Sequence, residues 1–155
     1  MLQLLRRRLR GEREGGFTLI ELMVVVLIIA ILIAIPTFLG ARTRAQNRAA
    51  QASLRNALVA AKSIYTDTQS YATAEGAGLT AVEPALTYKA KGTASTGQND
   101  ISADGTTNAG QWAGAALSAS GTCFWIKDNI SSGTTYGTGA TCTGTAALGA
   151  ANPSW

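Results

Sequence analysis

The residues of this chain that could take part in chemistry stand at the start of its one long apolar run, residues 17–41. Gly15 and Gly16 come directly before the run, and Glu21 is its only charged residue before Arg42. A glycine pair allows the backbone to extend into a protease active site close to a bilayer. A cut after Gly16 would leave the whole run on the mature chain and create a new ammonium group at Phe17.

Glu21 is unusual in a segment that is long enough to span a bilayer. A charge at the bilayer centre costs about 2.5–3.5 kcal/mol on insertion scales, and less near the end of a helix. Glu21 is either an acid tolerated at the interface or the partner of the new ammonium group at Phe17, one helical turn away, on its own chain or the next. Pairing between chains would favour one axial register of packed helices.

The composition gives no support to catalysis. The chain of 155 residues has no histidine, which excludes Ser-His and Cys-His nucleophile pairs. It has no glycine-rich loop followed by Lys and Ser or Thr that would cradle a phosphate. We therefore expect a protein that is not an enzyme and that uses no cofactor and no metal.

Two cysteines, Cys123 and Cys142, lie beyond the apolar run. If the run crosses a membrane with its N-terminus inside, both cysteines lie outside, where disulfides persist. One intrachain pairing exists, and it would stabilise the fold by about 3 kcal/mol in the chain-entropy model. The alternative is a pair of free thiols.

Residues 1–16 form a basic leader with five arginines and two glutamates, whereas the rest of the chain has eight basic and seven acidic residues. We interpret the leader arginines as a positive flank that holds the N-terminus in the cytoplasm. Nucleic-acid binding is the alternative. It has thin support, because the chain offers only three lysines after the predicted helix, namely Lys89, Lys91 and Lys127.

One long helix is predicted from about Phe17 to about Thr66. Residues 17–41 can span a bilayer, and Pro36 is expected to kink the helix without ending it. Residues 42–66 are amphipathic, because apolar side chains recur at spacings of three and four and form one face: Ala50, Leu54, Leu58, Ala61 and Tyr65. Such a helix would be about 75 Å long, which suits a subunit whose tail packs into something else.

Residues 67–155 are predicted to form a small β-rich domain. Strands are expected at 86–91, 115–120 and 122–128, with a turn at Gly121 and a last extended piece through Cys142. Loops are expected at 70–82, 93–110 and 131–139. An antiparallel sheet against the amphipathic helix face gives an α+β fold. Aromatic residues would supply much of its buried area: Tyr71, Tyr88, Trp112, Phe124, Trp125 and Tyr136.

The segment Gly16-Phe17-Thr18-Leu19-Ile20-Glu21, followed by an unbroken aliphatic run, resembles the class III signal of type IV prepilins and related pseudopilins. The likeness is close over residues 15–36 and looser along the helix to Tyr65. The C-terminal part resembles that of many pilins only in its general plan, a sheet closed by a late disulfide, here Cys123 to Cys142.

The resemblance implies a route of maturation and assembly. A membrane-embedded aspartyl prepilin peptidase would cut after Gly16 and N-methylate Phe17, and Glu21 would dock one subunit onto another. The mature protein would wait in the cytoplasmic membrane until an assembly ATPase and a platform protein move it into a helical homopolymer at the cell surface. Glu12 and Glu14 depart from the pattern, because they weaken the basic flank beside the cut.

Residues 93–110 contain the side chains of a candidate calcium site, Asn99, Asp100, Asp104 and Asn108. Their spacing does not match an EF-hand loop, so we interpret them as solvated loop residues. The glycosylation sequon at residues 129–131 is attributed to chance. The threonines and serines of residues 134–145 are interpreted either as sugar acceptors or as ordinary edge-strand and loop composition.

Several functions stay open at this point. A surface type IV pilin is favoured, and a type II secretion pseudopilin or a minor pilin is the alternative. A signal-anchored monomer that binds a ligand would stay uncut at Gly16 and would tolerate replacement of Glu21. A subunit of the DNA-uptake kind would need a basic patch on its exposed domain.

Overall fold

The computed structural model describes residues 16–155. The basic flank predicted within the leader lies outside the described residues. The chain forms two units that divide between Gly40 and Ala41. Helix α2, Leu19–Thr68, has 50 residues and contributes to both units. This helix confirms the long N-terminal helix predicted from the sequence.

The first unit is the described part of the chain up to Gly40, and almost all of it is helical. Every described residue from Gly16 to Leu39 is exposed. By length and composition, α2 is a helix that could cross a membrane. No described residue of the first unit therefore packs over the apolar half of α2.

Pro36 lies inside α2 and does not end it. The loss of one backbone N–H leaves a carbonyl of the preceding turn without its usual donor. The next residue, Thr37, donates its hydroxyl to the carbonyls of Ala34 at 2.8 Å and Ile33 at 3.5 Å. Continuation of the helix past the proline agrees with the prediction, and the kink at this residue stays a prediction.

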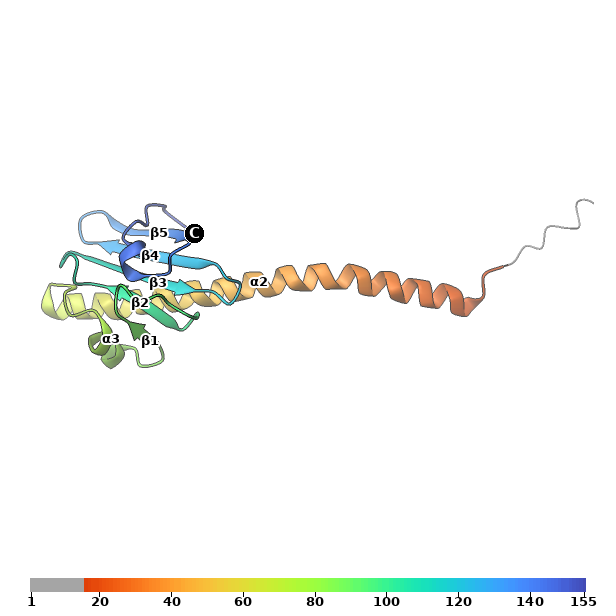
Figure 1. Cartoon of the computed structure of the whole chain (residues 1–155), viewed down its shortest axis with the longest axis horizontal. Coiled ribbons are helices and arrows are strands. Elements are labelled where there is room, and N and C mark those ends of the chain that lie inside the picture. Colours follow the sequence, from red (N-terminus) through yellow and green to blue (C-terminus); the bar gives the residue numbers. More distant parts are fainter. Residues whose placement is uncertain (1–15) are drawn as a thin grey trace, which may run out of the picture. The chain divides into compact units, whose positions relative to one another are not determined.

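The second unit, Ala41–Trp155, is built on a five-stranded sheet with the strand order β1-β2-β3-β4-β5 (Figure 1). The strands are β1 Thr87–Lys89, β2 Asp100–Asp104, β3 Gln111–Leu117, β4 Cys123–Asn129 and β5 Gly133–Gly139. Strands β2 to β5 are antiparallel to their neighbours, as predicted. Strand β1 is parallel to β2, because residues 90–99 carry the chain back to the start of β2. The prediction of a wholly antiparallel sheet is wrong at this edge.

The second half of α2 lies across one face of the sheet (Figure 1) and buries one of its own faces there. This face is the one predicted from the spacing of apolar residues, and its buried members include Ala50, Leu54, Leu58 and Ala61. Tyr65, half-buried, places its ring centroid 4.8 Å from that of Tyr71. Of the six aromatic residues expected to fill the core, three are buried, Tyr71, Trp112 and Phe124, and three are half-buried, Tyr88, Trp125 and Tyr136.

The opposite face of the sheet carries helix α4, Gly144–Ala147 (Figure 1). The disulfide lies on the same face. A second, smaller core forms there from small side chains, with Ala113, Ala115 and Ala147 around the two cysteines. The bond between Cys123 and Cys142 is formed. The predicted pairing is confirmed and the alternative of two free thiols is wrong.

Three segments predicted as loops contain regular structure. Residues 70–82 include helix α3, Gly76–Val82, whose Leu79 is fully buried. Residues 93–110 include β2, and residues 131–139 contain β5. The predicted extended piece through Cys142 is also wrong, because β5 ends at Gly139 and α4 begins at Gly144. The turn at Gly121 is confirmed: its φ is +88°, and its N–H donates to the carbonyl of Ser118 at 2.9 Å.

Close packing explains why β2 and β5 do not show the usual hydrophobic pattern. Ser102 and Asp104 of β2 are buried with their polar groups hydrogen-bonded. In β5, glycine leaves room for the ring of Trp125, which a Cβ on Gly139 would overlap. The glycine and threonine content that indicated turns belongs instead to a strand packed beneath an aromatic ring.

Candidate functional site

The candidate site is the start of α2, where the sequence predicts a cut between Gly16 and Phe17. Residues 16–18 are described but not helical, and the helix begins at Leu19. The side chain of Phe17 is 84% exposed. A Cβ on Gly16 would meet nothing within 4 Å. Both sides of the predicted scissile bond are therefore accessible, and folding of the described chain does not require glycine at position 16.

Thr18 and Glu21 form a capping box at the first turn of α2. The Glu21 Oε2 atom accepts the backbone N–H of Thr18 at 2.9 Å and its hydroxyl at 2.7 Å. In return, the Thr18 hydroxyl oxygen accepts the backbone N–H of Glu21 at 3.2 Å. These contacts satisfy backbone donors that have no partner within the helix. The sequence interpretation missed this role, although the pattern Thr-x-x-Glu before an apolar run is its signature.

The carboxylate of Glu21 lies on an apolar face of the first unit. Phe17, Ile20, Val24 and Val25 line a shallow hollow together with Glu21. Phe17 precedes the first helical residue, Leu19, yet its side chain lines the same hollow as Glu21. The structure therefore brings the two predicted site residues to one face, surrounded by exposed aliphatic side chains.

The apolar half of α2 exposes large side chains on every side. Seventeen residues contribute, and each is at least 49% exposed: Phe17, Leu19, Ile20, Leu22, Met23, Val24, Val25, Val26, Leu27, Ile28, Ile29, Ile31, Leu32, Ile33, Ile35, Phe38 and Leu39. A helix that is hydrophobic all round is normally buried in a protein core or in a membrane. This half of α2 thus has the surface of a buried helix, and none of residues 16–155 covers it.

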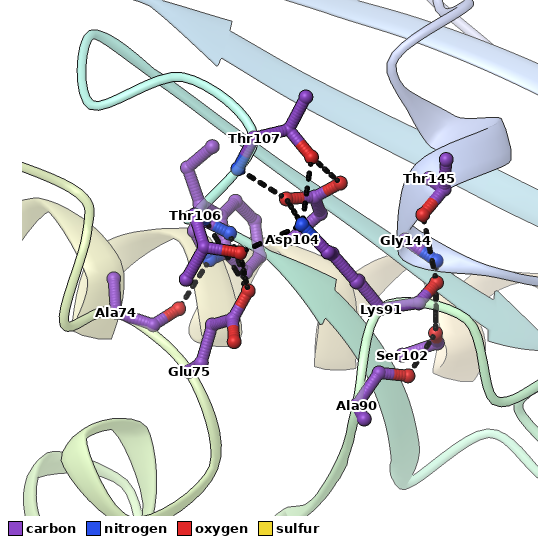
Figure 2. A network of polar contacts seen from close by, with 12 residues as sticks. Ala74, Glu75, Ala90, Lys91, Ser102, Asp104, Thr106, Thr107, Gly144 and Thr145 are labelled. Atoms are coloured by element: carbon purple, nitrogen blue, oxygen red, sulfur yellow. Dashed lines mark hydrogen bonds and ion pairs between the residues drawn. The ribbon is translucent and has the colours of Figure 1, made fainter.

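Asp104, one of the candidate calcium residues, is engaged by protein donors instead (Figure 2). Asp104 is buried and accepts the N–H of Thr107 at 3.0 Å and its hydroxyl at 2.8 Å, and Lys91 lies 3.9 Å from the same carboxylate. Within residues 16–155, no group of three or more acidic or cysteine side chains could hold a metal ion. The interpretation as solvated loop residues is wrong for Asp104, because β2 carries it into the interior.

Asp100 is the second carboxylate of that set, and it also lies on β2. It pairs with Lys89 at 2.7 Å and accepts the N–H of Thr96 at 2.9 Å and its hydroxyl at 2.7 Å. Burial alone would raise the pKa of Asp100, but these hydrogen bonds and the charge of Lys89 hold the pKa below its usual value. Asp100 is thus an ion-paired residue of the sheet.

The network in Figure 2 connects segments that are distant in the sequence. Glu75 Oε1 accepts the N–H groups of Gly105 and Thr106 at 3.1 and 3.3 Å and the Thr106 hydroxyl at 3.0 Å. The hydroxyl of Ser102 accepts the N–H of Gly144 at 2.8 Å. The carboxylates and hydroxyls of this region therefore hold the loops of the second unit together.

A further polar cluster, around Asp128, was missed by the sequence interpretation. One oxygen of Asp128 accepts the hydroxyl of Tyr71 at 2.7 Å, and the other accepts Lys62 at 2.9 Å and Thr134 at 2.6 Å. Burial raises the pKa of Asp128, but the donors outweigh it and the pKa lies below its usual range. Burial and the same carboxylate raise the pKa of Tyr71. The cluster fixes α2 to the sheet through one buried charge.

Comparison with known proteins agrees with the features at the start of α2. The sequence model of the prokaryotic N-terminal methylation motif matches residues 13–35. Among curated proteins, the type IV major pilin protein PilA of Myxococcus xanthus (strain DK1622) is 43% identical over 63 residues. This match covers 39% of the present chain and 29% of PilA, so the chain spans less than a third of that relative. No solved structure matches.

These two matches confirm the resemblance to prepilins and type IV pilins. The matched motif contains the predicted cleavage point at Gly16, the residue Glu21 and most of the apolar run. It covers most of the segment whose apolar side chains are exposed, which continues beyond the motif to Phe38 and Leu39.

Proposed function

We propose that this chain is the subunit of a type IV pilus, made as a prepilin whose leader is residues 1–16. A prepilin peptidase cuts the chain after Gly16 and methylates the new amino group of Phe17. The mature chain is anchored in the cytoplasmic membrane by the apolar half of α2, with its N-terminus inside. Copies of it then polymerise through that helix into a filament at the cell surface.

The observation that carries this proposal is the bare apolar half of α2. Soluble monomers rarely expose contiguous apolar patches of more than a few hundred Å², whereas here all large apolar side chains from Phe17 to Leu39 are exposed. Lipid covers such a surface before assembly, and the equivalent helices of other copies cover it afterwards. The methylation motif over residues 13–35 supports the same function.

Gly16 supports the proposed cleavage. The described chain leaves open space where a side chain at this position would lie. Packing in the described structure therefore does not require glycine at position 16. A requirement imposed by the active site of a processing protease accounts for it, because glycine lets the backbone extend into such a site.

Glu21 is proposed to dock subunits. Cleavage creates an ammonium group at Phe17, one turn before Glu21 on the same face. When the apolar helices pack together, both charges leave water, and a buried charge is strongly unfavourable without a partner. Glu21 then exchanges its contact with Thr18 for an ion pair with a Phe17 amino group, which favours one register of the helices.

The partners that follow are copies of this chain, the prepilin peptidase, an assembly ATPase and a platform protein. Nucleic acid is not among them. The three lysines after α2 are engaged within the chain: Lys89 with Asp100, Lys91 with Asp104, and Lys127 with the carbonyl of Leu148. This leaves no basic patch of free lysines on the sheet for a nucleic-acid backbone.

Shearing of cells that produce the chain tests the proposal. The sheared material is pelleted, and the share of this chain in the pelleted filaments is measured. We expect it to be the bulk component. A trace amount in filaments made of another protein would instead indicate a minor pilin or a pseudopilin. A chain found solely in the membrane with its leader intact would indicate a signal-anchored monomer and would contradict the proposal.

A further inference from the structure

The charges along the second half of α2 and the segment after it are segregated by sign. Residues 22–66 contain five basic residues and no acid, and residues 63–88 contain three acids and no basic residue. The basic residues are Arg42, Arg44, Arg48, Arg55 and Lys62, and the acids are Asp67, Glu75 and Glu83. The second unit thus has basic residues along its part of α2, and acidic residues in the last turn of α2 and in the segment that follows.

Two of the five basic residues have partners within the chain. Lys62 pairs with Asp128 at 2.9 Å, and the guanidinium carbon of Arg55 lies 4.9 Å from the centre of the Trp155 ring. The remaining three are exposed and form no ion pair with any residue from 16 to 155. We call these three residues, Arg42, Arg44 and Arg48, the basic end.

The acidic residues of the second unit likewise divide into those that are engaged within the chain and those that form no ion pair. Asp100, Asp104 and Asp128 are ion-paired, and Glu75 accepts hydrogen bonds from Gly105 and Thr106. Two others, Asp67 and Glu83, form no ion pair with a described residue. We call Asp67 and Glu83 the acidic end.

Both ends carry charge where the isolated chain disfavours it. Arg44 and Arg48 are four residues apart on one helix face, and like charges at this spacing destabilise a helix. Asp67 lies in the last turn of α2, which contains no basic residue. An acid there faces the negative end of the helix dipole. An opposite charge supplied from outside the chain would relieve each of these contacts.

The acidic end also borders a hollow that a second molecule can enter. Its lining includes Val59 and Val82, which are 68% and 45% exposed, and Glu83 stands among the same residues. The other lining residues are Asn56, Ala60 and Ser63. The Glu83 carboxylate accepts the backbone N–H of Ala85 at 3.3 Å but has no basic partner among the described residues. Apolar surface beside such a carboxylate is suited to a protein partner that brings a basic side chain on a helix.

We infer that the basic end of one copy of this chain binds the acidic end of a second copy. Arg48 and Asp67 are separated by about 28 Å along the helix axis, so they cannot pair within one chain. A head-to-tail contact between different patches propagates into an open polymer when the rotation does not close a ring. The inference rests on the proposed function and adds to it a second contact, outside the apolar helix core.

Anionic lipid headgroups are the competing occupant of the basic end, because three arginines follow the apolar run directly. A second copy is the better match for two reasons. The chain itself presents a complementary acidic end, and lipid would leave that end unpaired. The experiment therefore distinguishes charge pairing between copies from attraction to lipid.

Charge exchange in the full-length chain tests the inference. One variant is Arg44→Glu with Arg48→Glu, the second is Asp67→Lys with Glu83→Lys, and the third combines all four changes. The yield of sheared filaments is measured relative to processed chain in the membrane. Each double variant is expected to lower the yield about tenfold, given the usual strength of surface ion pairs. The combined variant is expected to return to within about twofold of wild type, because the pairs re-form with reversed sign.

The control is Arg44→Lys with Arg48→Lys, which keeps the charge and is expected to assemble like wild type. Double variants that assemble like wild type, or a combined variant that stays as poor as they are, would overturn the inference. If the combined variant stays poor, binding to vesicles that contain phosphatidylglycerol is measured for the purified mature chain. Weaker binding by the Arg44→Glu, Arg48→Glu variant than by wild type would assign the basic end to lipid. If wild type itself forms no filaments, the proposed function fails; if wild type assembles, only this inference is at stake.

Discussion

Glu21, at the start of α2, has one role in the single chain and a different role proposed for it in a filament. The Glu21 carboxylate holds the backbone N–H and the hydroxyl of Thr18, so it stabilises the first turn of the helix. In a filament, the same carboxylate is proposed to bind the amino group of Phe17. Substitution of Glu21 therefore removes a helix cap and a docking charge together, and a test must separate these two effects.

We predict that Glu21→Ala lowers the yield of sheared filaments at least about tenfold, whereas Thr18→Ala lowers it much less. Thr18→Ala removes the cap, which typically stabilises a helix by about 1 kcal/mol, and it leaves the charge of Glu21 in place. Filament yield and the amount of processed chain in the membrane are measured for both variants. Equal losses in the two variants would reduce the role of Glu21 to capping.

Asp128 is the residue that most directly connects α2 to the sheet. It is 5% exposed and accepts three side-chain donors. Hydrogen bonds to a charged group typically contribute about 1.5–3 kcal/mol. All three tryptophans, Trp112, Trp125 and Trp155, lie in the second unit, so their fluorescence reports on the unfolding of this unit.

We predict that Asp128→Asn lowers the free energy of unfolding by about 2 kcal/mol at pH 7. The pKa of Asp128 is lowered by folding, so its contribution is fully present above the unfolded pKa of about 3.9 and is lost as the pH falls through the folded value. The difference between variant and wild type should therefore shrink below about pH 4. Urea unfolding of the full chain in detergent measures it, with variant and wild type compared at each pH. A difference that stays constant down to about pH 2 would contradict the role of the carboxylate charge.

At the scale of elements, the disulfide joins the first residue of β4 to the segment between β5 and α4. The backbone carbonyl of Cys142 also accepts the N–H of Ser95 at 2.8 Å. The buried members of the small core on this face are three alanines and the two cysteines, and the larger side chains packed against it, Leu117, Trp125 and Leu148, are only partly buried. We infer that the covalent link, more than apolar burial, holds the end of the chain on this face.

We predict that Cys123→Ser with Cys142→Ser lowers the free energy of unfolding by about 3 kcal/mol, the chain-entropy value for a loop of this length. Reduction of the wild-type chain should have the same effect, and it should leave the double variant unchanged. Urea unfolding followed by tryptophan fluorescence measures both. Identical unfolding midpoints for the oxidised wild type and the double variant would show that the link does not stabilise the second unit.

The elements that the sequence predicted well are those with a strong local pattern. The 3.6-residue spacing from Ala50 to Ala61 indicated the buried face of α2. The strand predicted at residues 122–128, after the turn at Gly121, corresponds to β4. Strands β2 and β5 were missed because their side chains are stabilised by distant partners. Ser102 of β2 accepts the N–H of Gly144, 42 residues later, Asp104 pairs with Lys91 of the preceding loop, and the glycines of β5 make room for Trp125. Such tertiary compensation leaves no periodic signal in the sequence.

The sequence predicted where the candidate site lies in the chain, but it predicted only some of the contacts that its residues make. Gly16, Phe17 and Glu21 form a short local motif, so sequence alone placed them together. The Thr18 contact was equally local and was visible in the Thr-x-x-Glu pattern. The Asp128 cluster was not visible, because it joins Lys62, Tyr71 and Thr134 across long distances in the chain.

For the whole molecule, one helix serves two different environments. The half in the second unit buries one face against the sheet, while all large side chains of the first half are exposed. The basic end and the acidic end of the second unit also lack ion-pair partners among the described residues. Both surfaces lack a partner among the described residues of one copy, and the proposed polymer of copies would cover them together.

The most direct test of this account is intact mass measurement with N-terminal sequencing of the chain recovered from sheared surface filaments. We predict a bulk component that begins at Phe17 and carries an added methyl group on its amino terminus. The membrane fraction of the same cells should contain the same processed chain. A chain that retains Met1 to Gly16, in a host that processes other prepilins, would contradict cleavage, docking through the Phe17 amine and the proposed filament together.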